Sequence, residues 1–199
     1  MRTKMIKRVI SSILALALTA VCGISALAAD TTDTGTGTVN GNVTLSGSIR
    51  ALTISVTHPL TADYTIDPNT GATGTFTAPD IIVKNLTKVP VNVTVSSLKA
   101  TSGGVVTFTD VDPADKTWAA LNTADSKKYI AIGIKAKDAT GWSTGYSTAT
   151  HYAITDTASL IGSLPASTSG TLTLTANFGL GFDAAYTAKH SLVLMFNLV

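Results

Sequence analysis

Three carboxylates lie within six residues of one another near the middle of the chain: Asp110, Asp112 and Asp115. Carboxylate oxygens are the ligands that calcium prefers, so this spacing makes the segment a candidate calcium site. The segment lacks the glycine and the terminal glutamate of a standard calcium loop. The alternative is a short helix over residues 112–121, in which Asp112 caps the start and Pro113 takes the first helical position.

Histidine is the other residue type on which catalysis could rest. The chain has three histidines, His58, His151 and His190, which are far apart in the sequence, and it has no glutamate. The Gly-x-Ser-x-Gly match at residues 141–145 lies in a polar loop, whereas a nucleophile elbow needs a sharp turn from a strand into a helix. His190 falls on the apolar face of the final alternating run, which is typical of a core or edge histidine. We therefore expect a protein that is not an enzyme.

Two aromatic residues, Trp142 and Tyr146, lie in a polar loop over residues 138–150 that is rich in glycine, serine and threonine. Aromatic rings in such a loop can form a contact platform for a ligand. They can equally fold back to cover an edge of the core. The sequence leaves both interpretations open.

Residues 1–28 have the features of a secretory signal peptide. Three basic residues (Lys4, Lys7 and Arg8) precede an apolar run over residues 9–20, and Ala-Leu-Ala at 26–28 is a typical cleavage signal. The apolar run is too short for a membrane span. We expect cleavage before Ala29 and a secreted protein that acts outside the cell or at its surface.

The composition without this leader favours strands. It has 32 threonines, no glutamate and no glutamine, and threonine suits a pleated surface better than a helix. Removing the four basic residues of the leader leaves 14 − 4 = 10 basic against 12 acidic residues. A net charge near −2 gives no reason to expect nucleic acid or an anionic membrane as a partner. The single cysteine, Cys22, lies in the leader, so no disulfide stabilises the fold.

Period-two alternation of apolar and polar residues recurs along the chain. It is clearest over residues 76–98, which we predict to form an antiparallel hairpin, and again over residues 127–137, 171–178 and 188–198. Together the patterns predict an all-β fold, an antiparallel β-sandwich of Greek-key or jelly-roll type with about nine to eleven strands and one short helix. A barrel is the alternative.

The organisation that we expect is a signal peptide over residues 1–28, a flexible N-terminal arm over residues 29–42 and one β-sandwich domain over residues 43–199. The arm is rich in threonine, glycine and aspartate and has almost no apolar residue to bury. Val43, Leu45 and Ile49 begin the first alternating run. We predict that this run is an assembly strand, able to complete the sheet of another subunit.

Two segments resemble secreted β-sandwich proteins of Gram-positive bacteria. Residues 82–95 resemble a V-x-N-x-S/T-x-x-P-V-x-V segment of such proteins, and residues 186–199 resemble the closing strand of WxL surface domains, which associate with peptidoglycan. The defining Trp-x-Leu motif is absent. The architecture also resembles fibre subunits of the TasA and camelysin type, which assemble when an N-terminal segment joins the sheet of a neighbour.

The sequence therefore predicts a non-enzymatic extracellular or cell-surface protein, structural or adhesive, whose partner is a second copy of itself in a fibre or a surface layer. The alternative is a monomeric module of WxL-like type that binds cell-wall polysaccharide or peptidoglycan through Trp142 and Tyr146. No cofactor is expected, apart from calcium if the three aspartates bind it.

Overall fold

The computed structural model describes residues 47–199, and residues Arg50–Val199 form one compact unit. The predicted signal peptide, the predicted arm, Val43 and Leu45 lie outside the described residues. Among the described helices, none has the length and apolar character needed to cross a bilayer.

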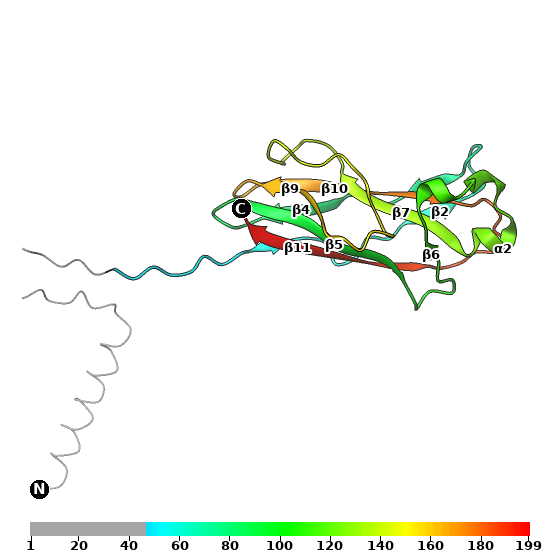
Figure 1. Cartoon of the computed structure of the whole chain (residues 1–199), viewed down its shortest axis with the longest axis horizontal. Coiled ribbons are helices and arrows are strands. Elements are labelled where there is room, and N and C mark those ends of the chain that lie inside the picture. The colour runs from blue at the N-terminus through cyan, green and yellow to red at the C-terminus, as the bar shows by residue number, and fades with distance from the viewer. Residues whose placement is uncertain (1–46) are drawn as a thin grey trace, which may run out of the picture. The chain divides into compact units, whose positions relative to one another are not determined.

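Two main sheets and one small ladder make up this unit (Figure 1). The first sheet has the order β1 (Val56–Thr57), β4 (Ile81–Asn85), β10 (Ser169–Phe178), β7 (Tyr129–Ala136) and β6 (Thr109–Asp110), and β8 (His151–Tyr152) also pairs with β7. The second has the order β11 (Lys189–Leu198), β5 (Val91–Thr101) and β9 (Ser159–Leu164). The ladder joins β2 (Thr65–Asp67) and β3 (Thr75–Thr77). All pairs are antiparallel except β6 with β7.

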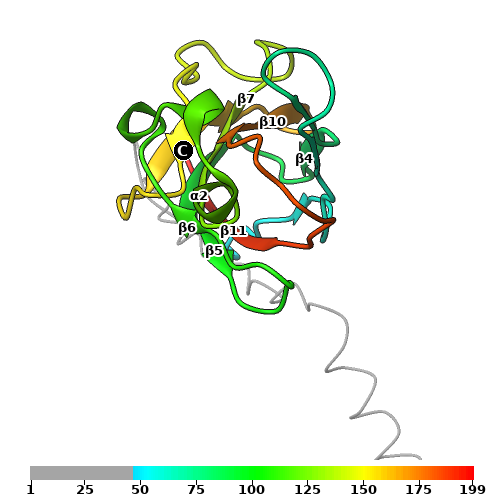
Figure 2. The same ribbon diagram turned by 90° about the vertical axis from the view of Figure 1, so that its right-hand side faces the viewer.

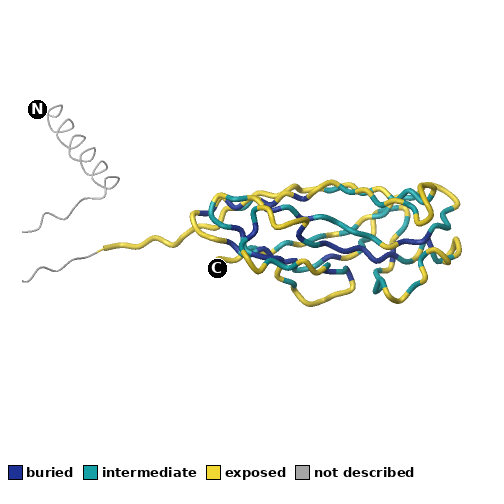
Figure 3. The backbone as a smooth tube through the Cα atoms, turned by 90° about the horizontal axis from the view of Figure 1, so that it is seen from above, coloured by how far each residue is buried: buried dark blue, intermediate teal, exposed yellow. Residues whose placement is uncertain are grey.

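The two main sheets pack face to face, as the end-on view shows (Figure 2). One apolar cluster joins Val83, Ile134 and Leu172 from the first sheet to Val95 and Ile161 from the second, all of them fully or almost fully buried. The buried positions follow the inner sides of the strands, whereas the loops are mostly exposed (Figure 3). The predicted all-β sandwich is confirmed.

The predicted hairpin over residues 76–98 is wrong, because β4 and β5 belong to different sheets. Both strands carry one apolar face, and the two faces meet across the sandwich instead of pairing side by side. The connection is stabilised by Asn85, which is completely buried. Its amide nitrogen donates to the carbonyl oxygens of Val89, Leu164 and Pro165 at 2.9, 3.0 and 3.0 Å, and its oxygen accepts from the Thr87 amide at 2.8 Å.

The predicted helix over residues 112–121 is replaced by shorter elements. Two 3-10 turns, η1 (Pro113–Asp115) and η2 (Trp118–Ala120), precede α2 (Thr123–Ser126). The cap is as predicted, since the Asp112 carboxylate accepts from the Ala114 amide at 2.8 Å. Lys116 then adopts an extended conformation and ends the first turn.

The strand predicted near the start of the domain is reduced to the two residues of β1. Residues 47–55 form no strand, and the apolar side chains of Leu52 and Ile54 remain 44% and 38% exposed. Hydrogen bonds nevertheless attach β1 to its neighbours. Val56 pairs with Asn85, the Thr87 hydroxyl accepts from the Ser55 amide at 2.9 Å, and the Leu86 amide donates to the Ser55 carbonyl at 2.8 Å.

Candidate functional site

A cavity of about 1360 Å³ opens along one side of the unit Arg50–Val199. Apolar side chains from both sheets line its interior, among them Ile81, Leu98, Phe108, Ile132, Leu174, Leu192 and Leu194. Two stretches of chain border its opening, residues 58–69 and residues 182–190. We call this opening the groove. An apolar lining with a few polar groups is typical of a binding site.

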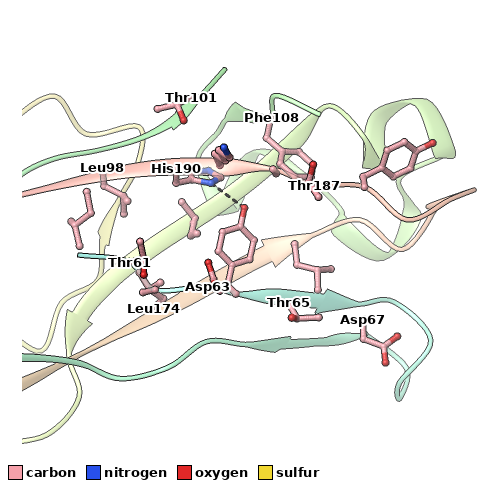
Figure 4. A pocket seen from close by; sticks show the side chains of 18 of the residues that line it. Thr61, Asp63, Thr65, Asp67, Leu98, Thr101, Phe108, Leu174, Thr187 and His190 are labelled. Carbon is pink, nitrogen blue, oxygen red and sulfur yellow. Dashed lines mark hydrogen bonds between the residues drawn. The ribbon is translucent and has the colours of Figure 1, made fainter. Parts of the chain in front are cut away.

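One side-chain hydrogen bond spans the groove. The Tyr64 hydroxyl lies 3.1 Å from Nδ1 of His190 (Figure 4), and no other side-chain hydrogen bond joins the two bordering stretches among the described residues. We call this contact the Tyr64 bridge. The Tyr64 ring also packs edge-on against the His190 ring, with centroids 5.8 Å apart, and tilts against Phe76 at 5.5 Å.

His190 connects the bridge to a buried carboxylate. Its Nε2 lies 3.2 Å from Oδ1 of Asp110, and the two side chains are only 5% and 13% exposed. The other oxygen, Oδ2, accepts from the Ala100 amide at 2.7 Å. Because a carboxylate only accepts, Nε2 of His190 is the donor to Asp110, which leaves Nδ1 to accept from the Tyr64 hydroxyl.

This chain of three groups has the connectivity of a nucleophile, a base and a carboxylate. Burial, followed by the negative charge of Asp110, raises the pKa of Tyr64 to about 12. At neutral pH Tyr64 is therefore a neutral hydrogen-bond donor to His190 across the groove.

The strand β11 forms the other notable feature of the groove. It has ten residues, and within the described part of the chain it pairs with β5 alone, so its second edge is free. The inward-facing side chains of His190, Leu192, Leu194 and Phe196 alternate with exposed residues, as the sequence predicts, yet they are only partly buried. A free strand edge beside half-exposed apolar side chains is a surface on which another strand can pair.

The three aspartates of the predicted calcium site have different surroundings. Asp110 contacts His190 and the Ala100 amide, Asp112 caps the first 3-10 turn, and Asp115 is exposed. Within residues 47–199, no group of three or more histidine, cysteine or acidic side chains is arranged to hold a metal ion. The predicted calcium site is not formed in this structure.

The predicted aromatic contact loop folds back onto the core. Trp142 is buried, and Tyr146 packs against the same apolar cluster. The tryptophan ring lies so close to Gly170 that a Cβ atom there would come within 2.5 Å of it. Trp142 therefore provides no exposed platform, and the second interpretation of this loop is the correct one.

The remaining predicted residues lie apart from one another. Ile49 is fully exposed and belongs to no strand. His58 stacks on Phe196 at a centroid distance of 5.9 Å. His151 is buried in β8, and burial lowers the pKa of its imidazole.

Tyr64 is not among the residues predicted from the sequence. The sequence does contain a signal for it, because Ala62, Tyr64 and Ile66 alternate with polar residues as in a half-buried strand. The structure confirms that these three residues are half-buried between exposed ones.

Comparisons with protein-family models, with curated proteins and with solved structures gave no match to this chain. The resemblances to WxL domains and to TasA-type fibre subunits therefore stay predictions.

Proposed function

We propose that this protein is an exported, non-enzymatic structural subunit that assembles with copies of itself by strand addition, in a fibre or a surface layer. The observation that carries the proposal is the free edge of β11 beside an open apolar cavity. A strand added there would cover Leu192 and Leu194, which the subunit alone leaves partly exposed.

The donor in this proposal is the segment of residues 43–49, which we call the arm segment. It alternates Val43, Leu45 and Ile49 with polar residues, as a half-buried strand does. In the described part, Ile49 is fully exposed. Burying three such side chains in a neighbouring subunit contributes about 1.5–3 kcal/mol each before the costs of association.

The electrostatics of the groove support a role in contact rather than in reaction. Tyr64 is kept protonated, and His190 and Asp110 are both engaged by neighbours. The alternative of a wall-binding module depends on an aromatic platform at Trp142, and that residue is buried.

The test compares the chain from Ala29 to Val199 with two deletion variants, one lacking residues 29–48 and one lacking only residues 29–40. Size-exclusion chromatography and negative-stain imaging should show large oligomers or fibres for the first chain and for the shorter deletion. They should show monomers for the longer deletion. A monomeric wild-type chain that sediments with purified cell wall would overturn the proposal in favour of a wall-binding module, and oligomers that survive the longer deletion would exclude the arm segment as donor.

A further inference from the structure

Gly47 occupies a position in the arm segment at which the alternation calls for an apolar side chain. It has the same parity as Val43, Leu45 and Ile49. The structure gives no local reason for a glycine, because the φ angle of Gly47 is not in the left-handed region and an added Cβ would meet no atom within 4 Å. Within the described residues, the single subunit therefore has no contact that a side chain at position 47 would disturb.

The groove has four positions along β11 and its approach at which a side chain faces the cavity. They are Ala188, His190, Leu192 and Leu194. Three of them border open apolar space. At His190 the space is already taken, because the Tyr64 phenol reaches its ring across the groove at 3.1 Å. A strand that pairs with β11 would have room for side chains beside three positions and for none beside the fourth.

The four positions of the groove correspond in number and spacing to the four alternating positions of the arm segment. Since strands rise by about 3.3 Å per residue, both sets span the same length. Only one direction places the glycine at the obstructed position. In an antiparallel pair Gly47 lies opposite His190, with Leu45 opposite Leu192. In a parallel pair Leu45 would collide with the Tyr64 bridge.

We infer that the Tyr64 bridge sets the register of assembly: the arm segment of one copy pairs antiparallel with β11 of a second copy, with Gly47 opposite His190. This inference rests on the proposed function and specifies its geometry. A one-residue slip of a strand turns its apolar side chains to the wrong face, and a two-residue slip would drive Leu45 or Ile49 into the bridge. Tyr64 and His190 thus act as positioning residues for the incoming strand.

The register makes a prediction about cross-linking. It places Ser46 directly opposite Ser191, on the outer face and away from the bridge. Residues directly opposite have Cβ atoms about 5 Å apart, close to the disulfide range, whereas diagonal neighbours are about 7–8 Å apart. The chain after the predicted leader has no cysteine of its own, so every disulfide that forms must join the introduced cysteines.

The first experiment oxidises two double variants of the chain from Ala29 to Val199, S46C with S191C and, as the matched control, S46C with V193C. We expect a ladder of intermolecular disulfides for the first pair, and roughly tenfold less cross-linking for the control. Equal cross-linking, or a preference for the control pair, would overturn the register while leaving assembly by strand addition in place.

The second experiment tests the obstruction itself. Gly47→Leu should raise the concentration needed for assembly by roughly tenfold or more, the effect of overpacking one side chain. Gly35→Leu, within the residues 29–40 that the shorter deletion removes, should have no effect. Adding Tyr64→Ala to Gly47→Leu should restore assembly, since it removes the obstruction. Normal assembly of Gly47→Leu would overturn the inference, whereas a wild-type chain that forms no oligomers at all would overturn the proposed function as well.

Discussion

Tyr64→Phe removes one hydroxyl group and leaves the ring against Phe76 and His190. The substitution breaks the 3.1 Å hydrogen bond to Nδ1 of His190 and leaves that buried nitrogen without a partner. A lost bond of this kind costs about 1–2 kcal/mol. We therefore expect the variant to be less stable than the wild type by this amount at neutral pH.

The same hydroxyl makes the stability of the wild type depend on pH. Burial and the charge of Asp110 raise the pKa of Tyr64 from 10.0 to about 12 in the folded chain. A raised folded-state pKa means that the stabilisation is fully present below the unfolded pKa and is lost as the pH rises through the folded pKa. This difference in pKa corresponds to roughly 2.7 kcal/mol, and the partial exposure of the Tyr64 ring to the cavity reduces the effect to about 2 kcal/mol.

Urea unfolding of both proteins over the range from about pH 8 to pH 12 tests this reasoning. Lysines and the other tyrosines titrate in both proteins and cancel in the difference. The wild type should be the more stable below about pH 10, and the two free energies of unfolding should converge as the pH rises towards the folded pKa. A difference that stays constant across this range would refute the placement of Tyr64 in a buried hydrogen-bond network.

Three further predictions concern the fold around the groove. Asn85→Ala should lower the free energy of unfolding by about 3–4 kcal/mol, measured by chemical denaturation, because it leaves several buried backbone groups without a partner. Gly170→Ala should cost about 1–3 kcal/mol in the same assay, since the added methyl group would press into the Trp142 ring; an unchanged midpoint would contradict the packing. Calcium at millimolar concentration should leave the melting temperature unchanged, because Asp110 and Asp112 serve separate partners and Asp115 is exposed; a rise in melting temperature would show that a calcium site forms.

The sequence predicted the strands whose alternation is strong and long. The runs that became β7, β10 and β11 each place apolar residues on one face, and that pattern depends only on local spacing. It does not encode which strand lies alongside. For this reason the run over residues 76–98 was interpreted as a hairpin, although Asn85 directs the chain from one sheet to the other.

The candidate site could not be predicted from the sequence, for a different reason. Tyr64, Asp110 and His190 come from three segments separated by dozens of residues. Each residue alone has an ordinary interpretation as a turn, cap or core residue. Only the packing of the two sheets brings their polar atoms within hydrogen-bond distance of one another, and no local sequence pattern encodes that packing.

The attachment of β1 has a mechanical consequence. In an assembly joined through the arm segment, tension would enter each subunit at residues 50–55 and reach Thr87 and Leu86 through the paired bonds at Ser55. Asn85 lies on the same connection, and its side-chain hydrogen bonds would transmit the tension to the backbone carbonyl groups of Leu164 and Pro165, at the end of the strand β9 of the opposite sheet. Such tension would therefore reach both sheets through hydrogen bonds within the subunit.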